Sequence, residues 1–294
     1  MNSFYIIANQ LKPSCREYAL KIQKYLEEKG KICYVQLQED PCRAVSSAEQ
    51  YTQFRHNYTD ASKVPSDVEC VLVLGGDGTL LHAARDLVDR SIPMLGINLG
   101  TLGYLAGIES NHALEAIDRL IEDAYLTEER MMLTGTASRG EQILVQDIAL
   151  NDIVISRRGH LRVVDFRIYV DDSFLCSYRA DGIILSTATG STGYSLSAGG
   201  PIVSPTANLM LLTAIAPHTL NSRTIVLPDD VTVTVEFSGE ETACLDGAEV
   251  IFDGDTSKEL HSGDRIRIRR SGSSTKLIKL QQTSFVEILR KKMN

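Results

Sequence analysis

Residues 75–79, Gly-Gly-Asp-Gly-Thr, follow an apolar run that ends at Leu74 and precede a helical pattern. This order of strand, glycine turn and helix brings backbone N–H groups close to a phosphate, and glycine allows an approach that a Cβ would resist. A carboxylate beside a phosphate is repelled unless it binds a metal ion or a hydroxyl group that attacks the phosphate. Asp77 therefore indicates phosphoryl transfer, although the same residue types also occur in plain turns.

Other well-known catalytic patterns do not fit the chain. No Gly-Lys-Ser/Thr follows the turn, as a P-loop requires, and the glycines lack the spacing of the dinucleotide-binding fingerprint. The sequence also has no His-Glu-x-x-His motif and no Ser-His-Asp order that would indicate a metalloprotease or a hydrolase. His218 stands alone, and an isolated histidine is more often structural than catalytic.

Two further segments offer polar groups to a ligand. Residues 180–201 are dense in hydroxyls and glycines after an apolar strand, with Asp181 as a negative anchor. Composition alone favours a Ser/Thr-rich loop there, whereas the place of the segment between a strand and a small-residue helix favours binding. Asn151-Asp152, at the edge of another strand, can bind a base and a ribose diol, although Asn-Asp is also a common turn dipeptide.

Composition restricts the class of protein. The chain has 294 residues and a net charge of −8, which argues against a general nucleic-acid or anionic-membrane surface. No apolar stretch approaches the roughly 20 residues that cross a bilayer, and no signal-peptide pattern opens the chain. The cysteines show neither a Cys-x-x-Cys nor a zinc spacing; they are Cys15, Cys33, Cys42, Cys70, Cys176 and Cys244. We therefore expect a cytoplasmic protein.

The first 125 residues alternate between strand and helix patterns. Expected strands cover residues 4–8, 32–37, 70–74 and 94–97. Ser14 and Asn111 are each expected to cap a helix, and a third helix is expected from Thr79 to Asp89. Residues 39–67 lack a clear period and are expected to form a flexible loop. Strands joined by helices predict a doubly wound parallel sheet, which binds ligands at the carboxyl ends of its strands. Asp77 falls at such an end.

The character of the chain changes after residue 126. Strict alternation over residues 164–170 and 231–237 predicts antiparallel strands and an all-β C-terminal domain. The final stretch reads as a helix, which needs a partner and is expected to pack back. We expect an α/β domain over residues 1–125, joined by the tail helix 284–294, and a β-rich domain over residues 126–283.

Together these stretches resemble the NAD kinase family. The matching segments are residues 75–79, 96–105, 151–152, 181–201 and 216–226. The Gly-Gly-Asp-Gly-Thr turn alone is shared with lipid kinases, whereas the Thr-x-Thr-Gly-Ser-Thr-x-Tyr segment is far more specific. The resemblance implies transfer of the γ-phosphate of ATP, with Mg²⁺ or another divalent metal, to the 2′-hydroxyl of the adenosine ribose of NAD.

The same resemblance implies roles for individual residues. Asp77 would orient the hydroxyl and help to deprotonate it, and Gly75, Gly76, Gly78 and Thr79 would form the phosphate-facing turn. The residues implied for NAD binding are Tyr104, Asn151, Asp152, Arg179, Asp181, Thr192, Gly193, Tyr194 and Ser197. Arg179 or Arg223 is a candidate for neutralising phosphate charge, and no metal ligand is assigned. Family members are commonly homotetramers or homodimers, so a homo-oligomer is expected.

Three positions depart from the usual pattern of the family. Asp152 replaces a glutamate, Ala188 replaces a proline and Gly193 replaces an alanine. Two alternatives remain: a lipid kinase, against which the hydroxyl-rich residues 186–197 argue, and a non-catalytic NAD-binding homologue, against which the intact Asp77 argues. The sequence leaves open the choice between ATP and polyphosphate and between NAD and NADH.

Overall fold

The computed structural model describes residues 1–9, 13–36, 59–100, 103–158, 164–219, 222–238, 247–280 and 284–293. The chain forms two compact units, one of residues 1–129 with 275–294 and one of residues 130–274. The sequence analysis assigned residues 275–283 to the β-rich part. Residues 275–280 belong instead to the first unit, where Leu277 pairs with Met94.

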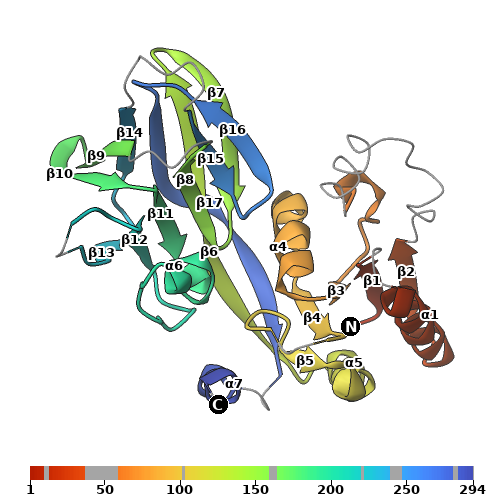
Figure 1. The fold of residues 1–294 in the computed structure, drawn as a ribbon. Helices are drawn as coiled ribbons and strands as arrows, with labels where there is room; N and C mark the ends of the chain where they lie inside the picture. The colour runs from red at the N-terminus through yellow and green to blue at the C-terminus, as the bar shows by residue number, and fades with distance from the viewer. Residues whose placement is uncertain are drawn as a thin grey trace. The chain divides into compact units, whose positions relative to one another are not determined.

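The first unit is built on a parallel sheet (Figure 1). Its strand order is β2 (Ile32–Gln36), β1 (Ser3–Ala8), β3 (Cys70–Leu74), β4 (Met94–Asn98), with β5 (Ile108–Glu109) paired to β4. Every residue of β1, β3 and β4 is buried, as expected for strands that are covered on both faces. The central strands agree with the prediction, and Leu37, the last residue of one expected strand, lies outside the described residues.

Helices cover both faces of this sheet. In the described residues of the unit, the helices are α1 (Pro13–Glu28), α4 (Asp77–Asp86), α5 (Ala113–Ile121) and α7 (Phe285–Met293), with short 3₁₀ turns η1 (Ala61–Lys63), η2 (Val88–Arg90) and η3 (Ser110–His112). Ile22 of α1 and Ile117 of α5 share a core cluster with Leu95. Leu80 of α4 packs on the other face, against Gly96, where an added Cβ would lie 2.7 Å from its Cδ1. The doubly wound arrangement is therefore confirmed.

The starts of three helices differ from the prediction. The helix expected from Thr79 begins two residues earlier, at Asp77. Ser14 was expected to cap the first helix, but α1 already begins at Pro13, and proline is favoured in the first helical position. Asn111 was expected to cap the helix that follows, but it lies inside η3, and α5 begins only after His112. Of the loop expected over residues 39–67, the part up to residue 58 lies outside the described residues.

The terminal helix α7 packs onto the first unit, as expected. Its start is a capping box: Glu287 N–H donates to Ser284 Oγ, and Ser284 N–H donates to a Glu287 carboxylate oxygen. Ile288 is 1% exposed and lies beside Gly107. Lys291 Nζ forms an ion pair with Glu109 at 3.3 Å.

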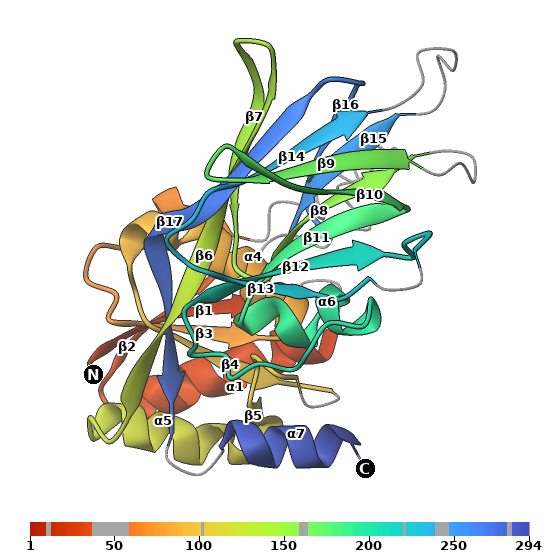
Figure 2. The ribbon, with the colours of Figure 1, turned by 90° about the vertical axis from the view of Figure 1, so that its left-hand side faces the viewer.

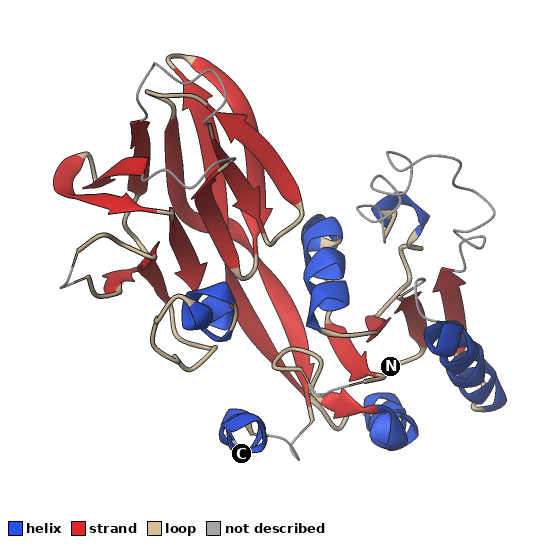
Figure 3. Ribbon diagram, viewed as in Figure 1, coloured by secondary structure: helices blue, strands red, loops and turns tan. Residues whose placement is uncertain are grey.

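Strands dominate the second unit (Figure 3). One antiparallel sheet, whose strands lie side by side in Figure 2, has the order β13 (Ile225–Pro228), β12 (Leu209–Ile215), β11 (Gly182–Thr187), β8 (Asp152–Arg157), β15 (Ala248–Phe252), β16 (Thr256–Leu260). The other has the order β10 (Ser173–Ala180), β9 (Val164–Val170), β14 (Val233–Ser238), β17 (Arg265–Lys279), and β6 (Leu126–Arg139) pairs with β7 (Gln142–Ala149).

The core of the second unit joins residues of both its sheets. Phe166 and Ile168 are fully buried and alternate with the exposed Asp165 and Arg167, as the sequence pattern predicted. Phe166 shares its core cluster with Ile155 of the six-stranded sheet. The all-β C-terminal part is therefore confirmed. Among the described residues of the whole chain, no helix is long and apolar enough to cross a membrane.

Candidate active site

The glycine turn places Asp77 at the carboxyl end of β3. Gly76 is the N-cap of α4, and Asp77 is the first residue of that helix. Gly75 N–H donates to the carbonyl of Ile97 at 3.0 Å, which ties the turn to the next strand. A Cβ at Gly75 would lie 2.3 Å from Thr79 Oγ1, so the turn needs glycine at this position.

Backbone N–H groups from the loop after β4 hold the carboxylate of Asp77. Oδ2 accepts from Tyr104 N–H at 2.8 Å, and Oδ1 accepts from the N–H groups of Leu105 and Ala106, each at 3.0 Å. Hydrogen bonds to an ionised acceptor are stronger than neutral ones. A carboxylate has about four acceptor sites, so three N–H donors fix its orientation and leave capacity for a further donor such as a hydroxyl group.

The glycines beside Asp77 leave room on the outside of the turn. A Cβ built at Gly76 or Gly78 would have no heavy atom within 4 Å. The start of a helix also presents N–H groups without intrahelical acceptors, which bind phosphate well. Thr79, predicted to face a phosphate, is buried, and its hydroxyl accepts from Asn9 Nδ2 at 3.4 Å. Its hydroxyl therefore supports the turn from inside.

Tyr104 lies under the terminal helix. The ammonium group of Lys292 is 4.9 Å from the centroid of the Tyr104 ring, which is a cation–π distance. The same loop residue donates its N–H to Asp77. Residues far apart in sequence thus converge on one loop of the first unit, whose neighbouring residues 101 and 102 lie outside the described part.

In the second unit, the predicted pair Asn151-Asp152 lies where β8 begins. Asp253, in the turn after β15, accepts hydrogen bonds from three consecutive N–H groups: those of Leu150 at 2.7 Å, Asn151 at 2.8 Å and Asp152 at 3.1 Å. Asp253 N–H donates in return to the carbonyl of Asp152 at 3.0 Å. The sequence analysis did not single out Asp253. The dipeptide Asp253-Gly254 signals a turn, but nothing local indicates which strand the turn contacts.

Both members of the pair have unusual side-chain environments. Burial, and secondly the charge of Asp253, raises the pKa of the Asp152 carboxyl to about 7. Asn151 Oδ1 is buried, and within the described part of the chain it has no hydrogen-bond partner. Buried polar atoms in proteins nearly always have partners. The pair is therefore suited to a polar ligand.

The hydroxyl-rich segment packs directly on this pair. A Cβ at Gly190 would lie 2.1 Å from the carbonyl oxygen of Asn151, so the two backbones are in close contact. A Cβ at Gly193 would lie 3.5 Å from Asn151 Nδ2 and 3.7 Å from Asp152 Oδ2. Thr187 N–H also donates to the Asn151 carbonyl at 2.9 Å. The structure thus brings together two segments that the sequence analysis predicted separately.

The remaining predicted residues of this segment lie at its surface end. Thr192 is the last residue of η4 (Thr189–Thr192), and its Oγ1 donates to the carbonyl of Thr189 at 3.4 Å. Tyr194 and Ser197 are the first and last residues of α6 (Tyr194–Ser197), and both are exposed. The Tyr194 ring, 46% exposed, is therefore free to contact a ligand.

Asp181 and Arg179 lie apart from the Asn151-Asp152 pair. Asp152 of β8 pairs with Ser186 of β11. The backbone carbonyl of Asp181 instead accepts from the N–H of Arg157, which lies five residues after Asp152 on β8. At about 3.4 Å per residue, that separation is about 17 Å. Arg157 Nε also donates to Asp181 at 2.8 Å, and the exposed Arg179 forms an ion pair with Asp165 at 3.4 Å.

The candidate residues do not form a metal-binding cluster by themselves. Within the described ranges, no group of three or more His, Cys, Asp or Glu side chains is arranged to hold a metal ion. Magnesium commonly binds through one or two carboxylates together with substrate phosphates. Asp77, which stands beside an open glycine turn, is consistent with a metal ion that arrives with a nucleotide.

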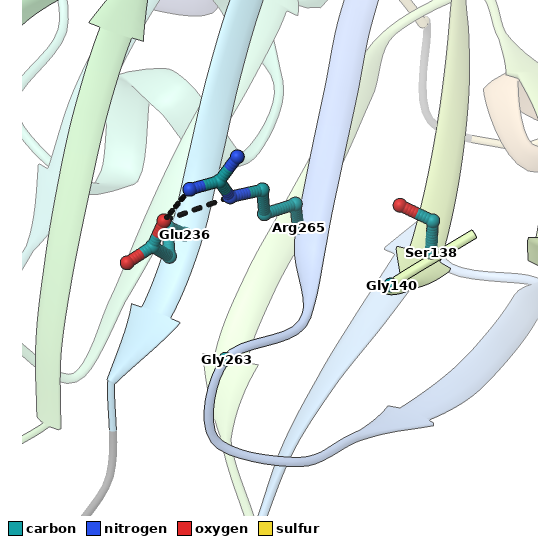
Figure 4. A pocket seen from close by; sticks show the side chains of 5 residues that line it. All are labelled: Ser138, Gly140, Glu236, Gly263 and Arg265. Atoms are coloured by element: carbon teal, nitrogen blue, oxygen red, sulfur yellow. Dashed lines mark hydrogen bonds and ion pairs between the residues drawn. The ribbon is translucent and has the colours of Figure 1, made fainter. Parts of the chain in front are cut away.

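The second unit has two cavities that neither Asn151 nor Asp152 lines. One, of about 300 Å³, is lined by Ser138, Gly140, Glu236, Gly263 and Arg265 (Figure 4). An ion pair between Glu236 and Arg265 at 2.7 Å lies along it. The other, of about 370 Å³, includes Arg223, one of the arginines considered for phosphate neutralisation.

Comparisons with known proteins agree with this description. The profile of the ATP-NAD kinase N-terminal domain matches residues 4–125, and that of the ATP-NAD kinase C-terminal domain matches residues 150–280. The NAD kinase of Lachnospira eligens is 43% identical over 302 aligned residues, covering 100% of each chain. That of Agathobacter rectalis is 45% identical, covering 100% of this chain and 99% of its own.

Solved structures give the same result for the fold. Yeast NADH kinase complexed with NADH has a TM-score of 0.79 at 25% identity, covering 99% of this chain and 86% of its own. An NAD kinase from Archaeoglobus fulgidus in complex with ATP has a TM-score of 0.72 at 23% identity, covering 99% of this chain and 98% of its own. The fold and the matches define a phosphotransferase, and the chain belongs to the ATP-NAD kinase family. The resemblance is thus confirmed, and the comparisons give no support to a lipid kinase.

Proposed function

We propose that this protein transfers the γ-phosphate of ATP to the 2′-hydroxyl of the adenosine ribose of NAD, giving NADP. The observation that carries the proposal is the Asp77 carboxylate, which three N–H groups hold at the carboxyl end of β3 beside an open glycine turn. The names of full-length relatives and the ATP and NADH complexes of the two structural neighbours support it.

Asp77 acts as the proton acceptor for the attacking hydroxyl. A ribose hydroxyl is a poor nucleophile near neutral pH, and a positioned carboxylate that takes its proton accelerates such a step by roughly 10²–10⁴. The three N–H donors hold the carboxylate in one orientation, and a carboxylate has a further acceptor site for the hydroxyl. Gly75, Gly76 and Gly78 let the backbone approach the phosphates, and Thr79 supports that turn.

Asn151 and Asp152 bind the adenosine part of NAD. The partnerless Oδ1 of Asn151 suits an amino donor on the base, and the carboxyl of Asp152 suits the ribose diol. Gly193 borders both side chains, and the exposed Tyr194 extends the contact surface together with Thr192 and Ser197. Tyr104, Arg179 and Asp181 remain proposed NAD-binding residues by resemblance to the family.

A divalent metal such as Mg²⁺ would neutralise phosphate charge and align the γ-phosphoryl group when bound with ATP. Asp77, beside the open glycine turn, is an acidic side chain suited to meet it. The separation of Asp181 from Asp152 fits a homo-oligomer, a homotetramer or a homodimer, in which a neighbouring subunit completes the NAD pocket. We place the protein in the cytoplasm.

One assay tests the function. The purified protein is incubated with NAD and ATP-Mg²⁺, and NADP is detected with an NADP-specific dehydrogenase. Formation of NADP supports the proposal, and NAD binding without turnover identifies a non-catalytic NAD-binding homologue instead. Replacing ATP with polyphosphate, and NAD with NADH, determines the preferred donor and acceptor.

A further inference from the structure

The carboxylate of Asp253 occupies an unusual position relative to the Asn151-Asp152 pair. It receives three consecutive backbone N–H groups, those of residues 150, 151 and 152, at 2.7–3.1 Å. Successive N–H groups that converge in this way form an anion-binding concavity. Here the anion is a side chain from a turn about 100 residues further along the chain.

Another turn of the same unit shows what a purely structural aspartate does. Asp171 also adopts a left-handed conformation, with φ of 47° against 49° for Asp253. Its Oδ1 accepts from Thr232 N–H at 2.9 Å, and its N–H donates to the Thr232 carbonyl at 2.9 Å. Asp171 thus ties its turn to a neighbouring segment with one carboxylate hydrogen bond, whereas the Asp253 carboxylate accepts at least three.

The charge of Asp253 also has a cost that a structural turn would avoid. It lies close enough to the buried Asp152 to disfavour ionisation of that carboxyl. Like charges at a buried site destabilise the folded state. Asparagine or glycine would suit the left-handed conformation without this repulsion, but neither offers two acceptor oxygens to the three N–H groups. The carboxylate therefore serves the backbone of residues 150–152 rather than the turn itself.

We propose that Asp253 is a positioning residue for NAD, which fixes the backbone of residues 150–152 so that the side chains of Asn151 and Asp152 face the adenosine. The proposal rests on the proposed function of the Asn151-Asp152 pair. Asp253 contacts the backbone of the pair and acts through it. Asp253→Asn keeps the size and the left-handed preference of the residue but turns an amide NH₂ or a single neutral oxygen toward three N–H donors.

The test compares Asp253→Asn with the matched control Asp171→Asn. For Asp253→Asn we expect the Kd for NAD, measured by calorimetry, and the KM for NAD to rise at least tenfold. The KM for ATP and the kcat at saturating NAD should stay within threefold of wild type. Asp171→Asn should leave all four constants within threefold. A Kd for NAD within threefold of wild type in Asp253→Asn, or an equal loss in the control, overturns the proposal.

Two further arms keep the test decisive. If the wild-type protein binds NAD but forms no NADP, the proposed function fails, whereas the calorimetric comparison still tests Asp253. If Asp253→Asn does not fold, hydrogen exchange is measured on the wild-type protein with and without NAD. We expect NAD to slow exchange in residues 148–153 and 252–256 together, and not at residues 171 and 232. Protection of residues 148–153 alone overturns the proposal.

Discussion

Gly103 lies directly against the carboxylate of Asp77: a Cβ at residue 103 would be 1.9 Å from Oδ1 and 2.6 Å from Cγ. The loop that donates three N–H groups to Asp77 therefore comes so close to it that no side chain fits between them. Glycine at residue 103 thus allows the Asp77 carboxylate to keep its orientation against the loop.

Gly103→Ala should inactivate the enzyme without removing any reactive group. The added methyl group must displace either the Asp77 carboxylate or the loop, so the aligned proton acceptor is lost. We expect kcat to fall on the order of 10²-fold, the lower range for loss of a positioned base. Steady-state kinetics measure this, with Gly272→Ala as the control, because a Cβ at Gly272 has no heavy atom within 4 Å. Wild-type kcat in Gly103→Ala would show that the contact is unimportant.

Two glycines of the hydroxyl-rich segment should respond differently to the same substitution. A methyl group at Gly190 would overlap the carbonyl oxygen of Asn151 at 2.1 Å, whereas at Gly193 the nearest atom would be 3.3 Å away. Gly190→Ala should therefore lower the melting temperature and weaken NAD binding at least tenfold. Gly193→Ala should bind NAD within threefold of wild type. Equal effects of the two substitutions would contradict the packing described for this segment.

Asp152 should make stability depend on pH. Its pKa is about 7 in the folded protein against an ordinary 3.8, so between these values the unfolded chain releases a proton that the folded protein retains. The stabilising contribution is therefore complete below about pH 3.8 and is lost as pH rises through about 7. Above that pH the loss is on the order of a few kcal/mol, because one pKa unit corresponds to about 1.4 kcal/mol.

Asp152→Asn removes this ionisation and should raise the urea midpoint of unfolding at pH 8 more than at pH 5.5. Asp165→Asn, which changes an exposed carboxylate of the same unit, serves as the control and should show no such difference. An equal gain for Asp152→Asn at both pH values would mean that the buried carboxyl does not titrate in this range.

Much of the fold follows from local patterns. The apolar run over residues 70–74 and the glycines after it predict the strand and the position of Asp77. Alternation over residues 164–170 predicts which side chains, such as Phe166, enter the core. Helix starts were less predictable, because Ser14 and Asn111 are good capping residues, yet Ser14 lies inside α1 and Asn111 inside the short helix η3.

The partners of the candidate residues could not be predicted. The carboxylate of Asp77 accepts from N–H groups 27 to 29 residues later in the chain. The backbone N–H of Asp152 donates to a carboxylate 101 residues later. Backbone donors have no sequence signature, since every non-proline residue has one. The separation of Asp181 from Asp152 likewise depends on strand register, which the segment's composition does not indicate.

The most direct test is the kcat of Asp77→Asn, measured with NAD and ATP-Mg²⁺ beside the Kd for NAD. The amide cannot accept the hydroxyl proton, so we expect kcat to fall at least 10²-fold, while the Kd for NAD stays within threefold of wild type. A kcat within threefold of wild type, about 0.7 kcal/mol of barrier, would contradict the assignment of Asp77 as the proton acceptor.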